Sequence, residues 1–248
     1  MIKASQGCLV SENAVYPFTD TAFVRNVKGA SENGIKCGAY HFLTGVTERE
    51  VELETNYFIG LVSRFRGNVG LFCACDIEDA RYKKLTKAQN TALVRLFADM
   101  VKEAGFTPVV YTNNDFRTNY LDLSALSDIG VWYATYRKTP SPTPKPDVPR
   151  IVMYQWSDRG KVDGIDGGVD LDEGYFEKEY AVGDRVRFRS DAVTYWKDGP
   201  KIPGYVKNGT WTVLQTSLGG KDVLKGGEKA VLLAGVNTWA AVSVIESL

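Results

Sequence analysis

The segment GLFCACDIE, residues 70–78, reads as a buried strand that ends in acidic residues. Most of its first part is small or apolar, which is typical of a strand covered on both faces in a parallel sheet. Residues i and i+2 of a strand share a face, so Asp76 and Glu78 are predicted to point one way and Cys75 and Ile77 the other. The segment therefore predicts a buried strand that delivers two carboxylates to one side at its carboxyl end.

Similar apolar runs recur through the first part of the chain, at residues 1–5, 36–42, 107–112, 130–136 and 150–156. The first four runs, with 70–78 as the third, start about 35 residues apart, the length of a βα unit. Residues 47–65 and 86–105 carry apolar side chains at helical spacing, and Gly105 suits a helix C-cap. The fold class predicted is α/β, a modified TIM-like β/α barrel with a closed sheet.

The sequence pattern changes twice after the run at residues 130–136. TPSPTPKPDVP (139–149) has the proline content of a linker, but another strand and another acidic cluster follow it, so we interpret it as a loop inside the first domain. From about residue 180 only short β-type runs occur, separated by turn residues, which predicts a small all-β SH3-like barrel. The predicted domains are residues 1–178 and 179–248.

Composition narrows the class of protein. The 248 residues balance 30 Lys and Arg against 30 Asp and Glu, and no basic block indicates a nucleic-acid partner. No apolar run reaches about 18 residues, so no membrane span is predicted. The start, MIKASQGCLV, lacks the features of a signal peptide. We expect synthesis in the cytoplasm, with release by lysis or a holin-type pore if the protein acts outside.

The residues that bind metals are few and scattered. Cys8, Cys37, Cys73 and Cys75 form no CxxC pair, and the single histidine, His41, stands in no ligand cluster. Structural zinc sites usually need four such ligands at characteristic spacing. We therefore expect no metal and no cofactor, and we interpret the cysteines as buried free thiols.

A second acidic cluster, VDGIDGGVDLDEGYF (162–176), follows the last strand-like run of the large domain. In a closed barrel it would bring Asp170 opposite Glu78. Two neighbouring carboxylates split their pKa values, so that one stays protonated as a general acid, and glycoside hydrolysis needs such a pair. The alternative is that these acids are solvated loop residues after a strand end.

Aromatic residues collect at the predicted strand ends: Tyr40, Tyr111, Trp132, Tyr136 and Trp156. Each alone fits core packing, whereas several at one barrel mouth suit stacking on sugar rings. His41, which follows Tyr40, fits either a hydrogen-bonded structural histidine or a cleft residue.

The motifs IKASQG, GAYHF, CDIE, VVYTN, VWYATY and YQWSDRGKVDGIDGGVDLD together resemble family 25 of the glycoside hydrolases, the muramidases of phages, bacteria and some fungi. The resemblance covers about residues 1–176. It implies hydrolysis of the β-1,4 bond between N-acetylmuramic acid and N-acetylglucosamine, with Glu78 as general acid, Asp76 as its carboxylate partner and Asp170 as a further acid. The residues predicted to bind substrate are Tyr40, His41, Tyr111, Trp132, Tyr136, Gln155 and Trp156.

One departure from this family stands at the start of the chain. Members normally carry a D-x-S-x-x-Q/N-G strand some 20–30 residues earlier, which supplies another active-site Asp, whereas Met1 here falls on the KAS strand. We expect a missing first strand, two unpaired sheet edges that invite self-association, and weakened or lost activity as one outcome. There are three explanations. The given start is too late, the gap is filled by another chain or by rearrangement, or the protein is a degraded paralogue.

The second domain resembles, more loosely, the bacterial SH3-like modules that anchor lysins to cell walls. This implies peptidoglycan as a partner and a raised local substrate concentration. The candidate contacts are Tyr195, Trp196, Tyr205, Trp211 and Trp239, each of which equally suits packing. The leading hypothesis is thus a wall muramidase. The rivals are a non-catalytic wall-binding protein on a truncated barrel and a glycosidase of chitin or another N-acetylated glycan.

Overall fold

The computed structural model describes residues 1–11, 14–175 and 180–248, with side chains for all of these except residues 8–11 and 14–16. The chain divides into two compact units, Met1–Tyr175 (unit 1) and Phe176–Leu248 (unit 2). The predicted boundary between residues 178 and 179, and the side chain of Cys8, lie outside the described part.

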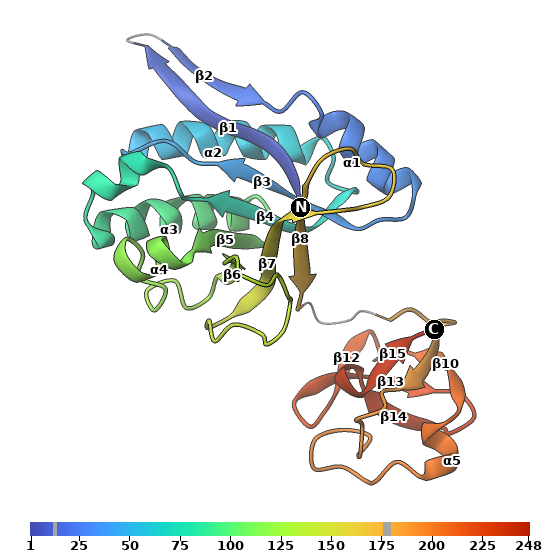
Figure 1. Cartoon of the computed structure of the whole chain (residues 1–248). Helices are drawn as coiled ribbons and strands as arrows, with labels where there is room; N and C mark the ends of the chain where they lie inside the picture. The colour runs from blue at the N-terminus through green and yellow to red at the C-terminus, as the bar shows by residue number, and fades with distance from the viewer. Residues whose placement is uncertain (12–13, 176–179) are drawn as a thin grey trace. The chain divides into compact units, whose positions relative to one another are not determined.

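Unit 1 is built on one eight-stranded sheet with helices against it (Figure 1). The sheet order is β2 (Ala14–Thr19), β1 (Ile2–Ser11), β3 (Cys37–Phe42), β4 (Val69–Asp76), β5 (Pro108–Asn113), β6 (Gly130–Ala134), β7 (Ile151–Gly160), β8 (Val169–Gly174). Neighbours from β1 and β3 through β7 are parallel, and the two outermost pairs, β1–β2 and β7–β8, are antiparallel. The six runs predicted as strands are thereby confirmed.

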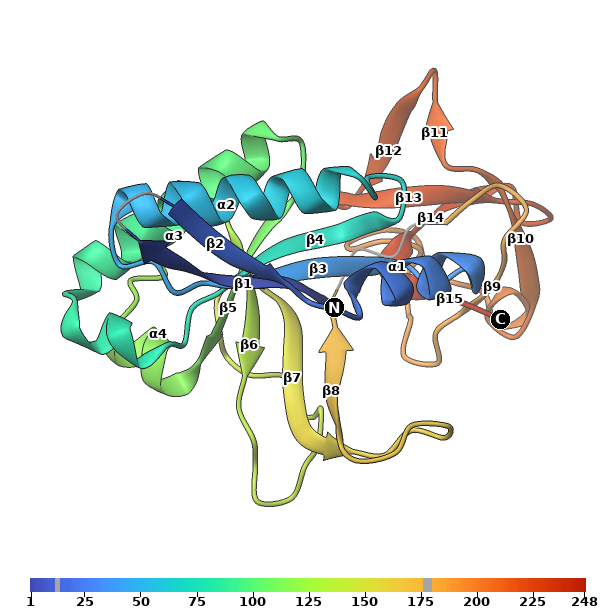
Figure 2. The same ribbon diagram turned by 90° about the horizontal axis from the view of Figure 1, so that it is seen from above.

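The closed barrel predicted from the sequence is wrong in one respect, because the sheet stays open. Among the described strands, β2 and β8 are the two ends of the hydrogen-bonded order. The sheet curls until the start of β1 comes beside β8 (Figures 1 and 2), yet these two strands do not pair. The predicted bare edge at β1 is short, since β2 pairs with β1 from Ser5 onward.

The helices of unit 1 are α1 (Phe23–Glu32), α2 (Glu48–Ser63), α3 (Lys87–Glu103), the short α4 (Asn114–Asn119) and the 3-10 helix η1 (Ala80–Lys84). Thr47 and Glu50 form a capping box that starts α2, and Thr86 and Gln89 form another that starts α3. Gly105 follows α3 with a φ of +79°, a left-handed conformation that glycine adopts without strain.

The two faces of the sheet carry different cores. The outer face packs on α2 and α3 through a large apolar cluster that includes Cys75, Ile77 and Phe97. The inner face carries a smaller cluster with Tyr111, Trp132 and others. Alternation along each strand therefore decides which residues reach the inner, concave side. The proline-rich segment 139–149 lies between β6 and β7, within unit 1.

Unit 2 is all-β apart from short helical turns at α5 (Gly204–Lys207) and η2 (Val242–Val244). Its strands are β9 (Arg185–Phe188), β10 (Thr210–Gln215), β11 (Ser217–Leu218), β12 (Lys221–Lys225), β13 (Glu228–Leu233), β14 (Thr238–Ala241) and β15 (Ile245–Ser247). The order is β11-β12-β13-β10-β9-β15, with β14 on β13. Thr194 and Lys201 form an isolated antiparallel bridge outside these strands.

Candidate active site

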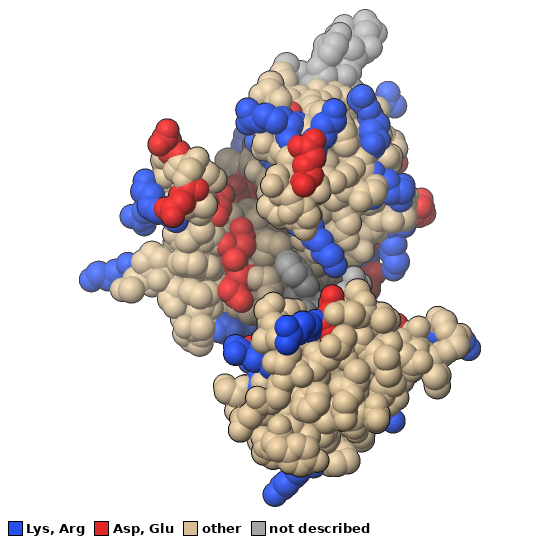
Figure 3. Space-filling view, turned by 90° about the vertical axis from the view of Figure 1, so that its right-hand side faces the viewer, with Lys and Arg blue, Asp and Glu red and all other residues tan. Residues whose placement is uncertain are grey.

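A cleft of about 710 Å³ opens on the concave side of unit 1, toward the carboxyl ends of the parallel strands. Its lining includes five acids, four aromatic rings and a glutamine: Asp20, Asp76, Glu78, Asp170, Asp172, Tyr40, Tyr111, Trp132, Tyr136 and Gln155. The space-filling view shows unit 1 hollowed between acidic side chains (Figure 3). Eight of the ten residues predicted for catalysis or substrate binding line this cleft.

Asp76, the last residue of β4, is almost fully buried, with 6% of its surface exposed. Its Oδ1 has no hydrogen-bond partner within the described part of the chain. Burial raises the pKa of Asp76 well above its usual value, the nearby Glu78 raises it further, and Lys3 opposes the shift. Asp76 therefore holds its proton at pH values where an exposed aspartate has lost it.

Glu78 lies on the same side as Asp76, as the strand alternation predicts, and it is half-buried. Burial raises the pKa of Glu78, a hydrogen bond from Asn113 lowers it, and the charge of Asp170 raises it again. The net shift is upward. A raised pKa keeps the carboxyl protonated at higher pH, which a general acid requires.

Asp170 and Asp172 reach the cleft from β8, two residues apart on one face. Partial loss of hydration raises the pKa of both carboxyls. Asp172 Oδ1 accepts a hydrogen bond from Trp132 Nε1 at 2.7 Å, which fixes the indole ring. The strand β8 that carries these acids pairs antiparallel with β7, a feature that the sequence did not indicate.

The aromatic residues of the cleft are held by one another and by Gln155. The hydroxyls of Tyr111 and Tyr136 both donate to Gln155 Oε1, at 2.9 and 2.6 Å. The Tyr40 and Trp132 rings meet edge to face with centroids 5.8 Å apart. Tyr136 is 45% exposed, whereas Tyr111 and Trp132 are buried, so Tyr136 and the half-buried Tyr40 offer the ring surface for stacking on a ligand.

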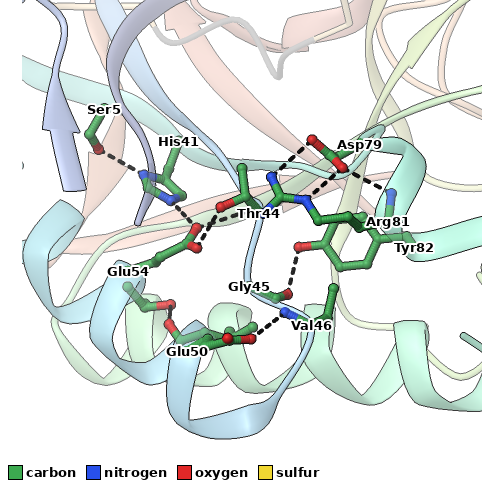
Figure 4. A network of polar contacts seen from close by, with 12 residues as sticks. Ser5, His41, Thr44, Gly45, Val46, Glu50, Glu54, Asp79, Arg81 and Tyr82 are labelled. Carbon is green, nitrogen blue, oxygen red and sulfur yellow. Dashed lines mark hydrogen bonds and ion pairs between the residues drawn. The ribbon is translucent and has the colours of Figure 1, made fainter. Parts of the chain in front are cut away.

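His41 and Trp156 do not line the cleft, so the substrate-binding role predicted for them is not retained. His41 lies on the outer face of β3, fully buried, with Nδ1 2.8 Å from Ser5 Oγ and Nε2 2.7 Å from Glu54 Oε2 (Figure 4). Trp156 packs, half-buried, against the outer core. Both immediately follow a cleft residue in a strand, which turns them to the opposite face.

The His41 contacts tie three elements together behind the cleft. Glu54 of α2 also accepts from the backbone N–H and the hydroxyl of Thr44, at 3.0 and 2.9 Å. Burial alone would raise the pKa of Glu54, but the hydrogen bonds from His41 and Thr44 outweigh it and the pKa falls. The network joins β1, β3 and α2 (Figure 4) and leaves each member satisfied.

Four polar lining residues were not predicted as site residues: Lys3, Asp20, Asn26 and Asp172. Lys3 is at the start of β1, Asp20 follows β2, and Asn26 is in the first turns of α1. Asp20 Oδ1 accepts from the backbone N–H of Ala22 at 2.9 Å. The hairpin strand β2, which brings Asp20 back to the cleft, contains Pro17 and gave no strand signal.

Among the wall-contact candidates of unit 2, Tyr195 and Trp211 serve its core. Tyr195 is buried, and its ring meets Phe188 edge to face at 5.5 Å. Trp211 is half-buried and donates from Nε1 to the carbonyl of Val206 at 2.9 Å. Packing therefore accounts for these two side chains.

The other three candidates present more surface. Tyr205 is 79% exposed. Trp196 is half-buried, with Lys225 Nζ 5.3 Å from its ring centroid, and Trp239 of β14 is also half-buried. Tyr205 is the candidate with the largest free ring surface.

Three further features concern metal binding, membrane spans and thiols. The described residues contain no cluster of three or more His, Cys, Asp or Glu side chains suited to a metal ion. No helix that the structure describes has the length and apolarity needed to cross a membrane. Cys37, Cys73 and Cys75 are buried free thiols, as predicted.

A curled α/β sheet with paired carboxylates and aromatic rings at its carboxyl edge has the make-up of a glycoside hydrolase site. The sequence comparison then identifies the family: residues 3–165 match the model for glycosyl hydrolases family 25, and the chain belongs to that family.

One curated relative agrees with this placement, and two solved structures share the fold. The autolytic lysozyme of Clostridium acetobutylicum is 30% identical over 186 residues, which are 75% of this chain and 50% of the relative. The spore cortex lytic enzyme SleM of Clostridium perfringens aligns over 97% of this chain and 78% of its own, with a TM-score of 0.61 and 22% identity. The catalytic domain of endolysin ply40, from a Listeria monocytogenes phage, aligns over 69% and 79%, with a TM-score of 0.55 and 20% identity. The chain spans about half the length of the curated relatives it matches.

Proposed function

We propose that unit 1 is a peptidoglycan hydrolase that cleaves the β-1,4 bond between N-acetylmuramic acid and N-acetylglucosamine. The observation that carries the proposal is the half-buried Glu78, whose pKa is raised, beside the buried Asp76 in an acidic cleft. Family membership and the lysozyme relative support it.

In this proposal protonated Glu78 donates its proton to the glycosidic oxygen as the bond breaks. Asp170 supplies a neighbouring carboxylate, which stabilises positive charge developing on the sugar ring. Asp76, in its protonated form, is a hydrogen-bond donor beside Glu78. The resemblance of the sequence to the family points to retention of configuration, with the acetamido group of the substrate as nucleophile and one Asp orienting it. Tyr40 and Tyr136 offer ring faces to the sugars, while Gln155 holds the Tyr136 hydroxyl.

The products of wall digestion test the bond assignment. Purified walls are incubated with the protein, and the newly formed reducing ends are reduced with borohydride and identified by mass spectrometry. We expect reduced N-acetylmuramic acid. The bond between C1 of that sugar and the bridging oxygen breaks, the oxygen leaves with N-acetylglucosamine, and water supplies the new hydroxyl at C1. Reduced N-acetylglucosamine would replace this proposal by a glucosaminidase, and wall binding without new ends would favour the non-catalytic binder.

We also propose that unit 2 is an SH3-like wall-binding module. The support is its small all-β architecture and the exposed ring of Tyr205. Its 9 Lys and Arg side chains exceed its 6 Asp and Glu side chains over residues 180–248, which suits a polyanionic wall.

Replacing Tyr205 by Ala is expected to weaken sedimentation with purified walls about fivefold, since an aromatic stacking contact contributes about 1 kcal/mol. The measurement uses the Glu78→Gln background, so that the wall stays intact. Leu218→Ala is the matched control, because Leu218 is also exposed in unit 2 and its loss should leave sedimentation unchanged. Equal sedimentation of the Tyr205 variant and its parent would remove Tyr205 from the contact surface.

A further inference from the structure

The charges that line the cleft of unit 1 are one-sided. Five lining residues are acids, and Lys3 is the only lysine or arginine among the described lining residues. A neutral sugar needs hydrogen bonds and ring contacts but no cation. Binding of neutral sugars therefore does not explain the ammonium group of Lys3 in this acidic cleft.

Lys3 faces the cleft from the start of β1. Its Cα pairs with that of Tyr40, whose side chain also lines the cleft. Lys3 is half-buried, its Nζ donates to Gln6 Oε1 at 2.6 Å, and its Nζ lies 5.6 Å from the centroid of the Phe42 ring. Among the described residues, no carboxylate lies within ion-pair distance of Lys3 Nζ. The side-chain acceptor that the structure shows for it is the neutral amide oxygen of the exposed Gln6.

Asp76, the buried acid of the cleft, does not neutralise this charge fully. Lys3 acts on Asp76 electrostatically and favours its ionised form, but burial and Glu78 prevail and the pKa of Asp76 stays raised. Where Asp76 is protonated, the ammonium group of Lys3 lacks an anionic partner, and an anionic group of a ligand can take that place.

We propose that Lys3 is a specificity-determining residue that binds the free lactyl carboxylate of a muramic acid residue. This inference rests on the function proposed above. The lactyl group is the one ionisable group attached directly to the sugars of the glycan, and its charge is lost when a stem peptide is joined to it as an amide. Lys3 lies on the cleft wall, where the sugar rings themselves must pass, so it meets this group rather than the outer carboxylates of the stem. The site thus prefers peptide-free glycan to peptide-bearing glycan.

The test measures binding by calorimetry in the Glu78→Gln background, where the ligand is not consumed. The ligands are a peptide-free muramic-acid-containing tetrasaccharide, the same tetrasaccharide with stem peptides, and N-acetylated chitotetraose, which has no carboxyl group. Lys3→Met is expected to weaken binding of the peptide-free ligand about tenfold, the size of a charge-assisted hydrogen bond, and to leave chitotetraose unchanged. The effect should shrink at high salt, and Lys3→Arg should restore most of it.

Lys84→Met is the matched control, because Lys84 is an exposed lysine of unit 1 outside the cleft lining. A thermal melt checks that each variant folds. Equal weakening for all three ligands, or no weakening for the peptide-free one, would overturn the role of Lys3. If the parent binds none of the muramic ligands, the proposed function fails as well, and that outcome is visible before any Lys3 variant is compared.

Discussion

Replacing Glu78 by Gln is expected to slow the clearing of bacterial cell walls by about 10²–10⁴-fold, the usual contribution of a general acid. Glutamine keeps the size of the side chain and can still accept the hydrogen bond from Asn113, but it has no proton to give. Sedimentation with walls should persist, since binding does not depend on that proton. A turbidity assay on purified walls measures the rate.

The pH dependence of the parent's clearing rate tests the role of Glu78 independently. Because the pKa of Glu78 is raised, its acid form survives to higher pH than in a free glutamate, and activity should fall as pH rises through that raised pKa. Glu173→Gln is the matched control, since Glu173 is an exposed residue of β8 that does not line the cleft. Clearing by the Glu78 variant within about threefold of the parent would reject Glu78 as the acid.

Replacing Asp76 by Asn should, at neutral pH, increase the free energy of unfolding by about 1–3 kcal/mol. The folded-state pKa of Asp76 is raised above 3.8. The unfolded chain therefore releases this proton more readily, and the stability that Asp76 contributes at low pH is lost as pH rises from about 4 through the folded pKa. Asparagine removes the penalty, so the gain should vanish below about pH 3.

Asp79→Asn is the matched comparison with the opposite sign. The side chain of Arg81 donates to Asp79 and lowers its pKa, so ionised Asp79 favours folding above its unfolded pKa. Its replacement should cost at most about 1 kcal/mol at neutral pH, because the pair is partly exposed. Denaturant unfolding at pH 3 and pH 7 measures both variants. Destabilisation by Asp76→Asn at pH 7 would contradict the buried, unpartnered carboxyl.

The fold of unit 1 was largely predictable because its six inner strands are recognisable as mainly apolar runs and two capping boxes start its longest helices. The hairpin strand β2 was not, since AVYPFT contains a proline and pairs only at the sheet edge. Unpaired sheet edges were expected from the absence of a first strand, but the antiparallel strands β2 and β8 that form the two ends of the open sheet were not. Closure depends on whether the first and last strands reach each other in space, which no local pattern encodes.

The cleft residues were predictable where a strand carried them. Asp76, Glu78 and Asp170 lie at alternating positions that can be read along the chain. Applied consistently, the same alternation would have excluded His41 and Trp156, because each is one residue from a cleft-facing neighbour. Asp20 and Lys3 stand alone in the sequence, and only the hairpin and the β1–β3 pairing bring them to the acids.

The sheet of unit 1 curls until β1 and β8 flank the cleft without a hydrogen bond between them. The two margins belong to the first and the last segments of the unit, so their spacing is fixed only through the bend of the strands between them. A glycan that contacts both β1 and β8 would hold the two strands together through non-covalent contacts. Its binding should slow amide hydrogen exchange in β1 and β8 together, although more than 150 residues separate them in sequence. Because β1 and β8 are not hydrogen-bonded to each other, a bound substrate can bridge these two strands of the open sheet.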